Sequence, residues 1–145
     1  MPFVKTDIVI RGDKQAIYDV IKDMVSYPKF MKNLVSVEVL EQHGDTDVTH
    51  WVSDVDGRKI VWTEKDFFYP AEHRITYSQT EGDLKKMEGA WEMDDVPGGV
   101  KVSLSVDFEF GIPMIAGLLN PILVRKVKEN SNAMLEAVKS QIEKA

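Results

Sequence analysis

Two carboxylates that stand two residues apart, Glu64 and Asp66, are the side chains whose spacing most directly suggests chemistry. Residues i and i+2 of a β-strand face the same way, so both would share a face with Ile60, Trp62 and Phe68. If that face points inward, each carboxylate must be protonated, hydrated or paired with a ligand group. The alternative is a strand that extends beyond its cover, or a β-bulge, either of which leaves both carboxylates in water.

A buried pair of carboxylates can act as general acid and base, and Tyr77 is a suitable hydrogen-bond donor to complete such a site. The candidate catalytic residues are therefore Glu64, Asp66 and Tyr77. Serines are present, for example at Ser53 and Ser78, but without the glycines of a nucleophile elbow.

Other classes of site are disfavoured by composition and spacing. The chain has no cysteine, which excludes thiolate nucleophiles, disulfides and cysteine-ligated zinc. His43, His50 and His73 are scattered without metal-ligand spacing, so the sequence predicts no metal and no cofactor. His50 alternates with Val48 and Val52 and could contact the interior.

Charge and hydropathy limit the partners. A net charge of −6 disfavours nucleic acid, whose phosphate backbone requires concentrated positive charge. The most apolar segment, residues 108–124, contains Glu109, Pro113 and Pro121 and is a poor membrane span. No secretory leader is visible at the N-terminus. We expect a cytoplasmic protein, and 145 residues predict one domain that comprises residues 1–145.

The elements that would position these residues begin with a strand at residues 4–10. Asp13 is a suitable N-cap for a helix whose apolar residues Ile17, Ile21 and Met24 recur at helical spacing. Tyr27-Pro28 should end that helix, because the residue before proline avoids the α conformation. Residues 28–32 could form a second short helix.

The period then changes from helix to strand. Strands are predicted at 35–40, 46–55, 59–68, 73–80, 85–93 and 100–110, with the hairpin signal Asp56-Gly57 between the second and third of these. In the first of them, Val35, Val37 and Val39 alternate with more polar residues. The last should have one buried and one solvated face, with Val100 to Phe110 inward and Lys101 to Glu109 outward. From residue 113 the apolar residues recur at helical spacing up to the C-terminus. Pro121 can occupy the first turn of the main helix with Asn120 as its cap, which leaves residues 112–119 as a preceding turn or loop.

A long sheet with one apolar face must curl around its cover, and that cover is the C-terminal helix. We expect the two to leave a cavity between them. Packing of the tryptophans into an ordinary core is the alternative. The predicted ligand-binding residues that would line the cavity are Trp62, Glu64, Phe68, Tyr77, Met87, Trp91, Phe108, Met114, Leu118 and Ile122.

Several motifs together resemble the START-like, Bet v 1-like (SRPBCC) superfamily, in its bacterial polyketide cyclase/dehydrase and coenzyme Q-binding branch. They are residues 27–31 (YPKFM), 37–40 (VEVL), Trp62, residues 87–92 (MEGAWE) and residues 108–119. The resemblance implies an α+β helix-grip fold: a curved antiparallel sheet of about seven strands around a long C-terminal helix, with two short helices after the first strand. Such folds often hold a lipid, quinone or polyketide in a deep cavity.

The same resemblance identifies a difference. Aromatase/cyclase relatives carry an arginine four residues after the tryptophan that corresponds to Trp62, and here that position is Asp66. The loss of a fixed cation counts against cyclase activity. Arg58 and Arg74 remain, at a turn and at an out-of-phase strand position.

The sequence therefore favours a protein that binds or carries a hydrophobic small molecule over an enzyme. One alternative is a polyketide aromatase/cyclase. A second is a ribosome- or protein-interaction module. Residues 114–119 could also make transient contact with a membrane, without stable insertion. The oligomeric state is not determined by the sequence.

Overall fold

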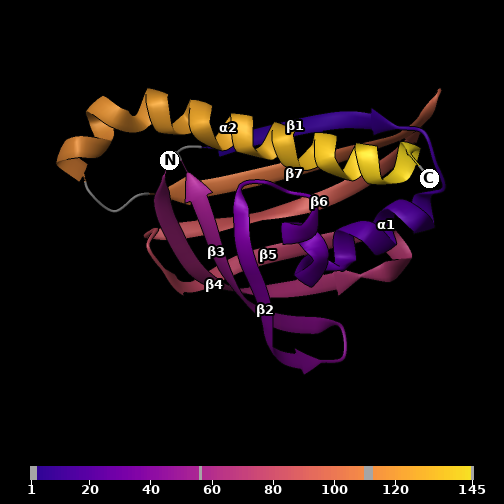
Figure 1. Ribbon diagram of the computed structural model, residues 1–145, viewed down its shortest axis with the longest axis horizontal. Helices are drawn as coiled ribbons and strands as arrows, with labels where there is room; N and C mark the ends of the chain where they lie inside the picture. Colours follow the sequence, from indigo (N-terminus) through magenta and orange to yellow (C-terminus); the bar gives the residue numbers. More distant parts are fainter. Residues whose placement is uncertain (1–2, 56, 110–112, 145) are drawn as a thin grey trace.

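The computed structural model describes the backbone of residues 3–55, 57–109 and 113–144. Within these ranges, the side chains of residues 55, 58 and 113–123 are not described. The order of elements is β1 (Phe3–Ile10), α1 (Lys14–Lys22), the 3-10 helix η1 (Met24–Lys29), β2 (Leu34–His43), β3 (Thr46–Val55), β4 (Arg58–Tyr69), the 3-10 helix η2 (Pro70–Glu72), β5 (Arg74–Gly82), β6 (Lys86–Val96), β7 (Gly99–Glu109) and α2 (Pro113–Glu143) (Figure 1).

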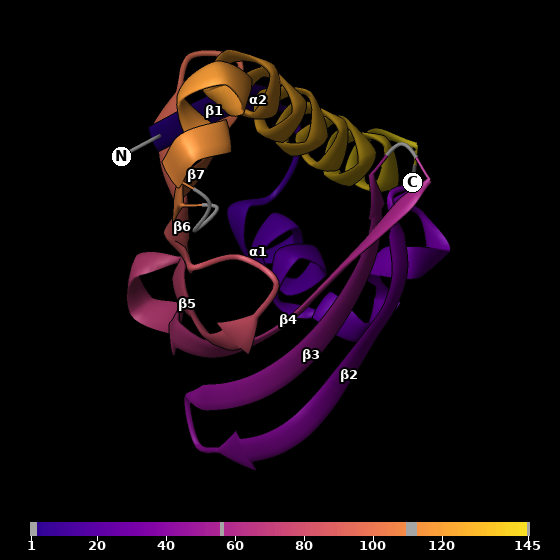
Figure 2. The ribbon, with the colours of Figure 1, turned by 90° about the vertical axis from the view of Figure 1, so that its left-hand side faces the viewer.

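The seven strands form one antiparallel sheet in the order β1-β7-β6-β5-β4-β3-β2. The sheet curls strongly, and Figure 2 shows it bending around α1 with α2 lying across the end formed by β1 and β7. The described part of α2 packs against β1, β7 and α1. This is the helix-grip fold, so the predicted fold class, the seven strands and the two short helices after β1 are confirmed. The predicted start of the C-terminal helix at Pro121 is wrong, because α2 begins at Pro113 and continues through Pro121.

The first helix begins as predicted and ends earlier. The Asp13 side chain accepts a hydrogen bond from the backbone N–H of Ala16 at 3.0 Å, which caps α1. The helix ends at Lys22 rather than at Tyr27-Pro28, and Pro28 lies inside η1 instead of ending a helix. A 3-10 helix of six residues makes few backbone bonds, so the missing N–H of proline costs little there.

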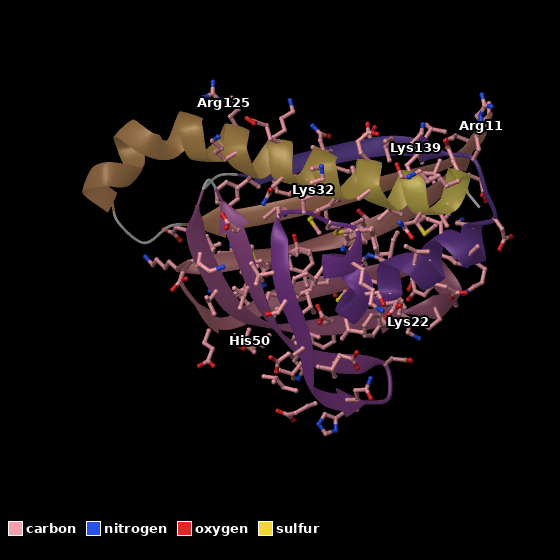
Figure 3. The ribbon with its side chains drawn as sticks, viewed as in Figure 1. Arg11, Lys22, Lys32, His50, Arg125 and Lys139 are labelled. Carbon is pink, nitrogen blue, oxygen red and sulfur yellow. The ribbon has the colours of Figure 1, made fainter. Side chains whose placement is uncertain are left out.

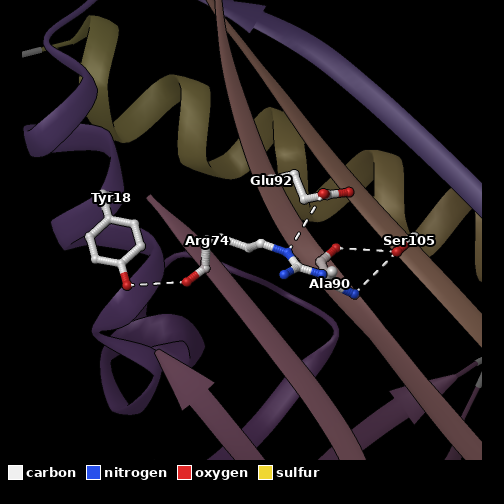
Figure 4. A network of polar contacts seen from close by, with 5 residues as sticks. All are labelled: Tyr18, Arg74, Ala90, Glu92 and Ser105. Atoms are coloured by element: carbon white, nitrogen blue, oxygen red, sulfur yellow. Dashed lines mark hydrogen bonds and ion pairs between the residues drawn. The ribbon is translucent and has the colours of Figure 1, made fainter. Parts of the chain in front are cut away.

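The alternation of β7 is confirmed on its inner face, where Val100, Val102, Leu104, Val106 and Phe108 are all buried. The expectation that the other face is solvated is wrong at Ser103 and Ser105, which are buried as well. The reason for Ser105 is local: its hydroxyl accepts from the backbone N–H of Ala90 at 3.1 Å and lies against β6 (Figure 4).

The alternation of β2 is confirmed only at Val37, which is 8% exposed. Val35 and Val39 are 47% and 38% exposed, contrary to the pattern. The pairing of β2 with β3 shifts register twice, between Leu34 and Ser36 and between Val39 and Glu41. Each shift changes which residues face inward, and such irregularities are frequent on an edge strand.

Candidate functional site

Glu64 and Asp66 point into the curve of the sheet from the middle of β4. Glu64 is 3% exposed and Asp66 is fully buried, so the alternative of two solvated carboxylates is wrong. The β3–β4 pairing places Thr49 opposite Glu64, and the β4–β5 pairing places Tyr77 opposite Asp66. The pair therefore sits at the centre of three adjacent strands, with the rest of the inner face around it.

Neutral side chains hold the two carboxyl groups. The Thr49 hydroxyl donates to Asp66 Oδ2 at 2.6 Å, and the indole N–H of Trp62 donates to Glu64 Oε1 at 2.8 Å. The indole N–H of Trp51 in turn donates to the Thr49 oxygen at 2.7 Å, which fixes the direction of the Thr49 hydrogen bond. Asp66 Oδ1 is buried and has no hydrogen-bond partner among the described residues.

Burial raises the pKa of both carboxyl groups. The pKa of Glu64 lies well above its ordinary value, first because of desolvation and then because of hydrogen bonding to Asp66 and its charge. The pKa of Asp66 is also raised by burial, although the hydrogen bonds from Glu64 and Thr49 act in the opposite direction. A shared proton, carried mainly by Glu64, is the arrangement that these effects favour.

An aromatic cluster lies next to the pair. The ring of Tyr27 makes edge-on contacts with Phe30, Trp51 and Trp91, at centroid distances of 6.0, 5.7 and 6.2 Å. Trp51 and Trp62 are stacked with centroids 5.6 Å apart and ring planes within 9°. The cluster supplies flat apolar surface next to two acidic groups, which suits a ring system that carries a polar substituent.

Tyr77 lies in the site, but its hydroxyl is engaged. It donates to the backbone carbonyl of Ser105 at 2.7 Å, across the position of Gly89. A Cβ on Gly89 would stand 1.9 Å from that carbonyl oxygen and 2.7 Å from the tyrosine oxygen. Glycine is therefore required for the close approach of β5, β6 and β7. Burial raises the pKa of Tyr77 well above its ordinary value, so it stays neutral.

Burial is uneven along the interior. At the α1 end, Ile10, Ile17, Ile21, Val102 and Val138 are completely buried. Towards the opposite end, Trp62 and Met87 are only half-buried although both face inward, and Met134, Val124 and Val127 of α2 are half-buried as well. Cover is therefore uneven at this end, because Trp62 and Met87 remain partly exposed while Phe108, which pairs with Met87, is completely buried.

The remaining predicted ligand-binding residues have different outcomes. Phe68, Trp91 and Phe108 are inward and buried. Met114, Leu118 and Ile122 belong to α2, but their side chains lie outside the described residues. The cavity that they would help to enclose stays a prediction.

Two clefts are formed entirely by described residues. One, of about 300 Å³, lies between the end of α1 and the β2–β3 hairpin; its lining includes Lys22, Asp47 and, at its floor, Thr49. The other, of about 530 Å³, lies on the outer face of the sheet and includes Phe67, Tyr69 and Arg74. Neither lies between the sheet and α2.

The basic side chains and His50 are on the outside. His50 faces away from the interior, with its Nδ1 3.0 Å from the Thr63 hydroxyl, so the expectation that it could contact the interior is wrong. Figure 3 shows it on the outer side of the sheet, with Lys22, Arg125 and Lys139 spread over other parts of the surface. The reason is parity, because the inward residues of β3 are Thr49 and Trp51.

Arg74 is also on the outer face, as its out-of-phase position predicts. Its guanidinium lies 3.7 Å from Glu92 and over the ring of Tyr69, while its backbone carbonyl accepts from the Tyr18 hydroxyl at 3.3 Å (Figure 4). The side chain of Arg58 is outside the described residues. Among the side chains that the structure describes, no group of three His, Asp or Glu is arranged to hold a metal ion.

Sequence reasoning missed Thr49 and Tyr27. The signal for Thr49 was present: a two-residue loop at 56–57 pairs Val55 with Arg58, and counting back from that pair brings Thr49 opposite Glu64. Tyr27 had no comparable signal, because it comes from η1, which packs against β2 from outside the sheet register.

The model of the family described as polyketide cyclase/dehydrase and lipid transport matches residues 12–135. A protein of Thermus thermophilus is 25% identical, with a TM-score of 0.93 over 99% of this chain and 98% of that chain. The Zhui aromatase/cyclase from a Streptomyces species is 24% identical, with a TM-score of 0.87 over 98% of this chain and 93% of that chain. A START superfamily protein from Mycobacterium smegmatis is 17% identical, with a TM-score of 0.78 over 98% of this chain and 97% of that chain. A search of the curated proteins found no match.

Proposed function

We propose a function on the premise that this chain belongs to the polyketide cyclase/dehydrase and lipid transport family. The family supports the binding of hydrophobic ligands or a polyketide-cyclase role. Of these, we propose that the chain binds a hydrophobic small molecule of the lipid, quinone or polyketide type between the sheet and α2.

One observation carries the proposal: Trp62 and Met87 face the interior yet stay half-buried, whereas the inward residues near α1 are closed off. A ligand that covers the exposed apolar surface of such side chains stabilises the complex by about 25 cal/mol for each Å² that it removes from water. The family membership supports the same interior as the binding site.

The proposal is tested by ligand capture and thermal stabilisation. Native mass spectrometry of the purified chain, followed by organic extraction, should reveal a co-purified hydrophobic molecule. Oleic acid, decylubiquinone and the anthraquinone emodin then represent the three ligand classes, and at least one of them should raise the melting temperature.

A matched pair of variants locates the effect. Met87→Trp fills the half-covered interior and should abolish the rise in melting temperature, whereas Leu40→Trp, at a position that is 52% exposed on β2, should retain it. An empty preparation whose melting temperature none of the three compounds changes would overturn the proposal. If both variants lose the ligand-induced rise in melting temperature equally, the ligand does not bind at Met87.

A second candidate function is that of an aromatase/cyclase, favoured by the buried pair of Glu64 and Asp66. Carboxyl groups with a raised pKa are suited to proton transfer near neutral pH. In that case Glu64→Gln or Asp66→Asn should stop turnover of a polyketide substrate while leaving its affinity largely intact. Tyr77 would take part only by releasing the Ser105 carbonyl.

We also propose a cytoplasmic location and a single domain for residues 1–145. The lack of cysteine fits a reducing compartment, and the net charge of −6 fits a small-molecule rather than a nucleic-acid partner. In the part of the chain that the structure describes, no helix has both the length and the hydropathy to span a membrane.

A further inference from the structure

We propose that Glu64 and Asp66 form a specificity site for the polar end of the ligand, and that this site takes a hydrogen-bond donor, a hydroxyl or a protonated amine, in preference to a carbonyl oxygen. The inference rests on the proposed binding of a ligand between the sheet and α2.

The first argument is a count of donors and acceptors. Two carboxyl groups present four oxygen acceptors, and described side chains outside the pair supply two donors, the hydroxyl of Thr49 and the indole N–H of Trp62. Asp66 Oδ1 is buried and receives no hydrogen bond from a described residue outside the pair. The pair therefore has more acceptors than its described surroundings have donors.

The second argument is that the neighbouring donors are already used. The hydroxyl of Tyr27 donates to the backbone carbonyl of Ile21, and the hydroxyl of Tyr77 donates to the carbonyl of Ser105. The indole N–H of Trp51 is bonded to Thr49. Rotation of any of these groups towards the carboxyl pair would break a buried hydrogen bond, which costs about as much as it gains.

In the ligand-free chain, a proton shared between the two carboxyl groups supplies the missing donor, in line with the raised pKa of Glu64. A ligand hydroxyl can add its hydrogen bond to the pair, and a ligand ammonium can replace the shared proton with an ion pair. A carbonyl oxygen offers only another acceptor. It could bind only by taking the proton away from Asp66.

The third argument is position. Glu64 is hydrogen-bonded to Trp62, which is half-buried and stacked on Trp51, whereas Asp66 is completely buried and hydrogen-bonded to Thr49. A ring that lies against Trp62 would bring a short polar substituent to Glu64 first. Glu64 is therefore the specificity-determining residue, and Asp66 acts through it.

Four naphthalene derivatives of similar size test this inference by isothermal titration calorimetry: naphthylmethanol and naphthylmethylamine as donors, acetonaphthone as an acceptor only, and ethylnaphthalene as the apolar reference. The wild-type chain should bind both donors about ten-fold more tightly than the other two compounds. Tighter binding of the amine than of the alcohol would indicate an ion pair, and the reverse would indicate a neutral hydroxyl.

Variants then assign the preference to Glu64. Glu64→Met keeps the length of the side chain and removes both oxygens, so all four compounds should bind with similar affinity. Glu64→Gln introduces a donor and should raise the affinity for acetonaphthone relative to naphthylmethanol, which provides a second test if the methionine variant does not fold. Glu81→Met, at an exposed position of β5, should leave the wild-type order unchanged.

The outcomes separate this inference from the proposed function. If all four compounds bind the wild-type chain equally well, the specificity site is wrong and interior binding stands. If none of the four binds while oleic acid, decylubiquinone or emodin still raises the melting temperature, the specificity site is wrong and interior binding stands. If none of the seven compounds binds, both are wrong. If the donor preference persists in Glu64→Met, the preference arises elsewhere and the assignment to Glu64 is overturned.

Discussion

At the scale of single residues, Glu64 should make the free energy of unfolding fall as pH rises, whereas most carboxylates of folded proteins make it rise. Its pKa is raised in the folded chain, and in the unfolded chain it returns towards its ordinary value of 4.5. Above about pH 4.5 the folded state then holds a proton that the unfolded state releases, so the free energy of unfolding falls as pH rises. The free energy of unfolding continues to fall with rising pH until the carboxyl pair ionises in the folded chain.

The slope attributable to one such group is at most about 1.4 kcal/mol per pH unit. Urea denaturation between about pH 4 and pH 8 measures it. Glu64→Gln cannot ionise, and its free energy of unfolding should therefore decline less steeply with pH than that of the wild-type chain. Parallel curves for the two proteins would show that Glu64 titrates normally in the folded state.

The inward placement of Glu64 and Asp66 could be predicted because strand parity with Trp62 and Phe68 depends only on the sequence. Their partners could not be predicted in the same way. Thr49 required the register of the β3–β4 hairpin, and the contact between Tyr77 and the Ser105 carbonyl required the positions of three strands. The residue pattern of one strand gives neither the register nor the positions of the other strands. The hydrogen bond from the Tyr77 hydroxyl to the Ser105 carbonyl was therefore not predicted.

At the scale of secondary-structure elements, Gly89 determines how closely β5, β6 and β7 approach. Gly89→Ala should destabilise the chain by about 3 kcal/mol, because its Cβ would collide with the Ser105 carbonyl oxygen and with the Tyr77 hydroxyl. Backbone cannot move aside as a flexible side-chain end can. Thermal or urea denaturation measures the difference in the free energy of unfolding between Gly89→Ala and the wild-type chain.

Gly44→Ala is the matched control. No atom lies within 4 Å of the added carbon, and the only cost is the left-handed φ of +61°, about 1 kcal/mol. A Gly89→Ala variant that is no less stable than this control would mean that the strands have room to separate at Gly89.

Alternation and turn residues were sufficient to predict every strand of the sheet and the Asp13 cap of α1. They failed where the chain departs from a regular period. The two register shifts of β2 exposed Val35 and Val39, and η1 accommodated Pro28 inside a helix of a different kind. Both departures depend on how the segment packs against its neighbours, which periodicity does not encode.

At the scale of the whole molecule, the interior is continuous from one end to the other. The main cluster of buried residues and the smaller cluster of Val4, Val106 and Phe108 share a neighbour, because Met87 packs against both. We therefore expect one cooperative unfolding transition for residues 1–145. Far- and near-ultraviolet circular dichroism, followed in the same urea titration, should give coincident curves. A separate early transition in either signal would indicate two independent units.

The stacking of Trp51 on Trp62 gives the molecule an optical reporter of its own interior. Both indoles, together with Trp91, belong to the aromatic cluster next to the carboxyl pair, and they are the three tryptophans of the chain. Intrinsic tryptophan fluorescence therefore originates from this aromatic cluster, in which Trp62 is hydrogen-bonded to Glu64. A guest molecule that disturbs the parallel rings would change the emission and the exciton coupling between them, so occupancy can be followed without any label.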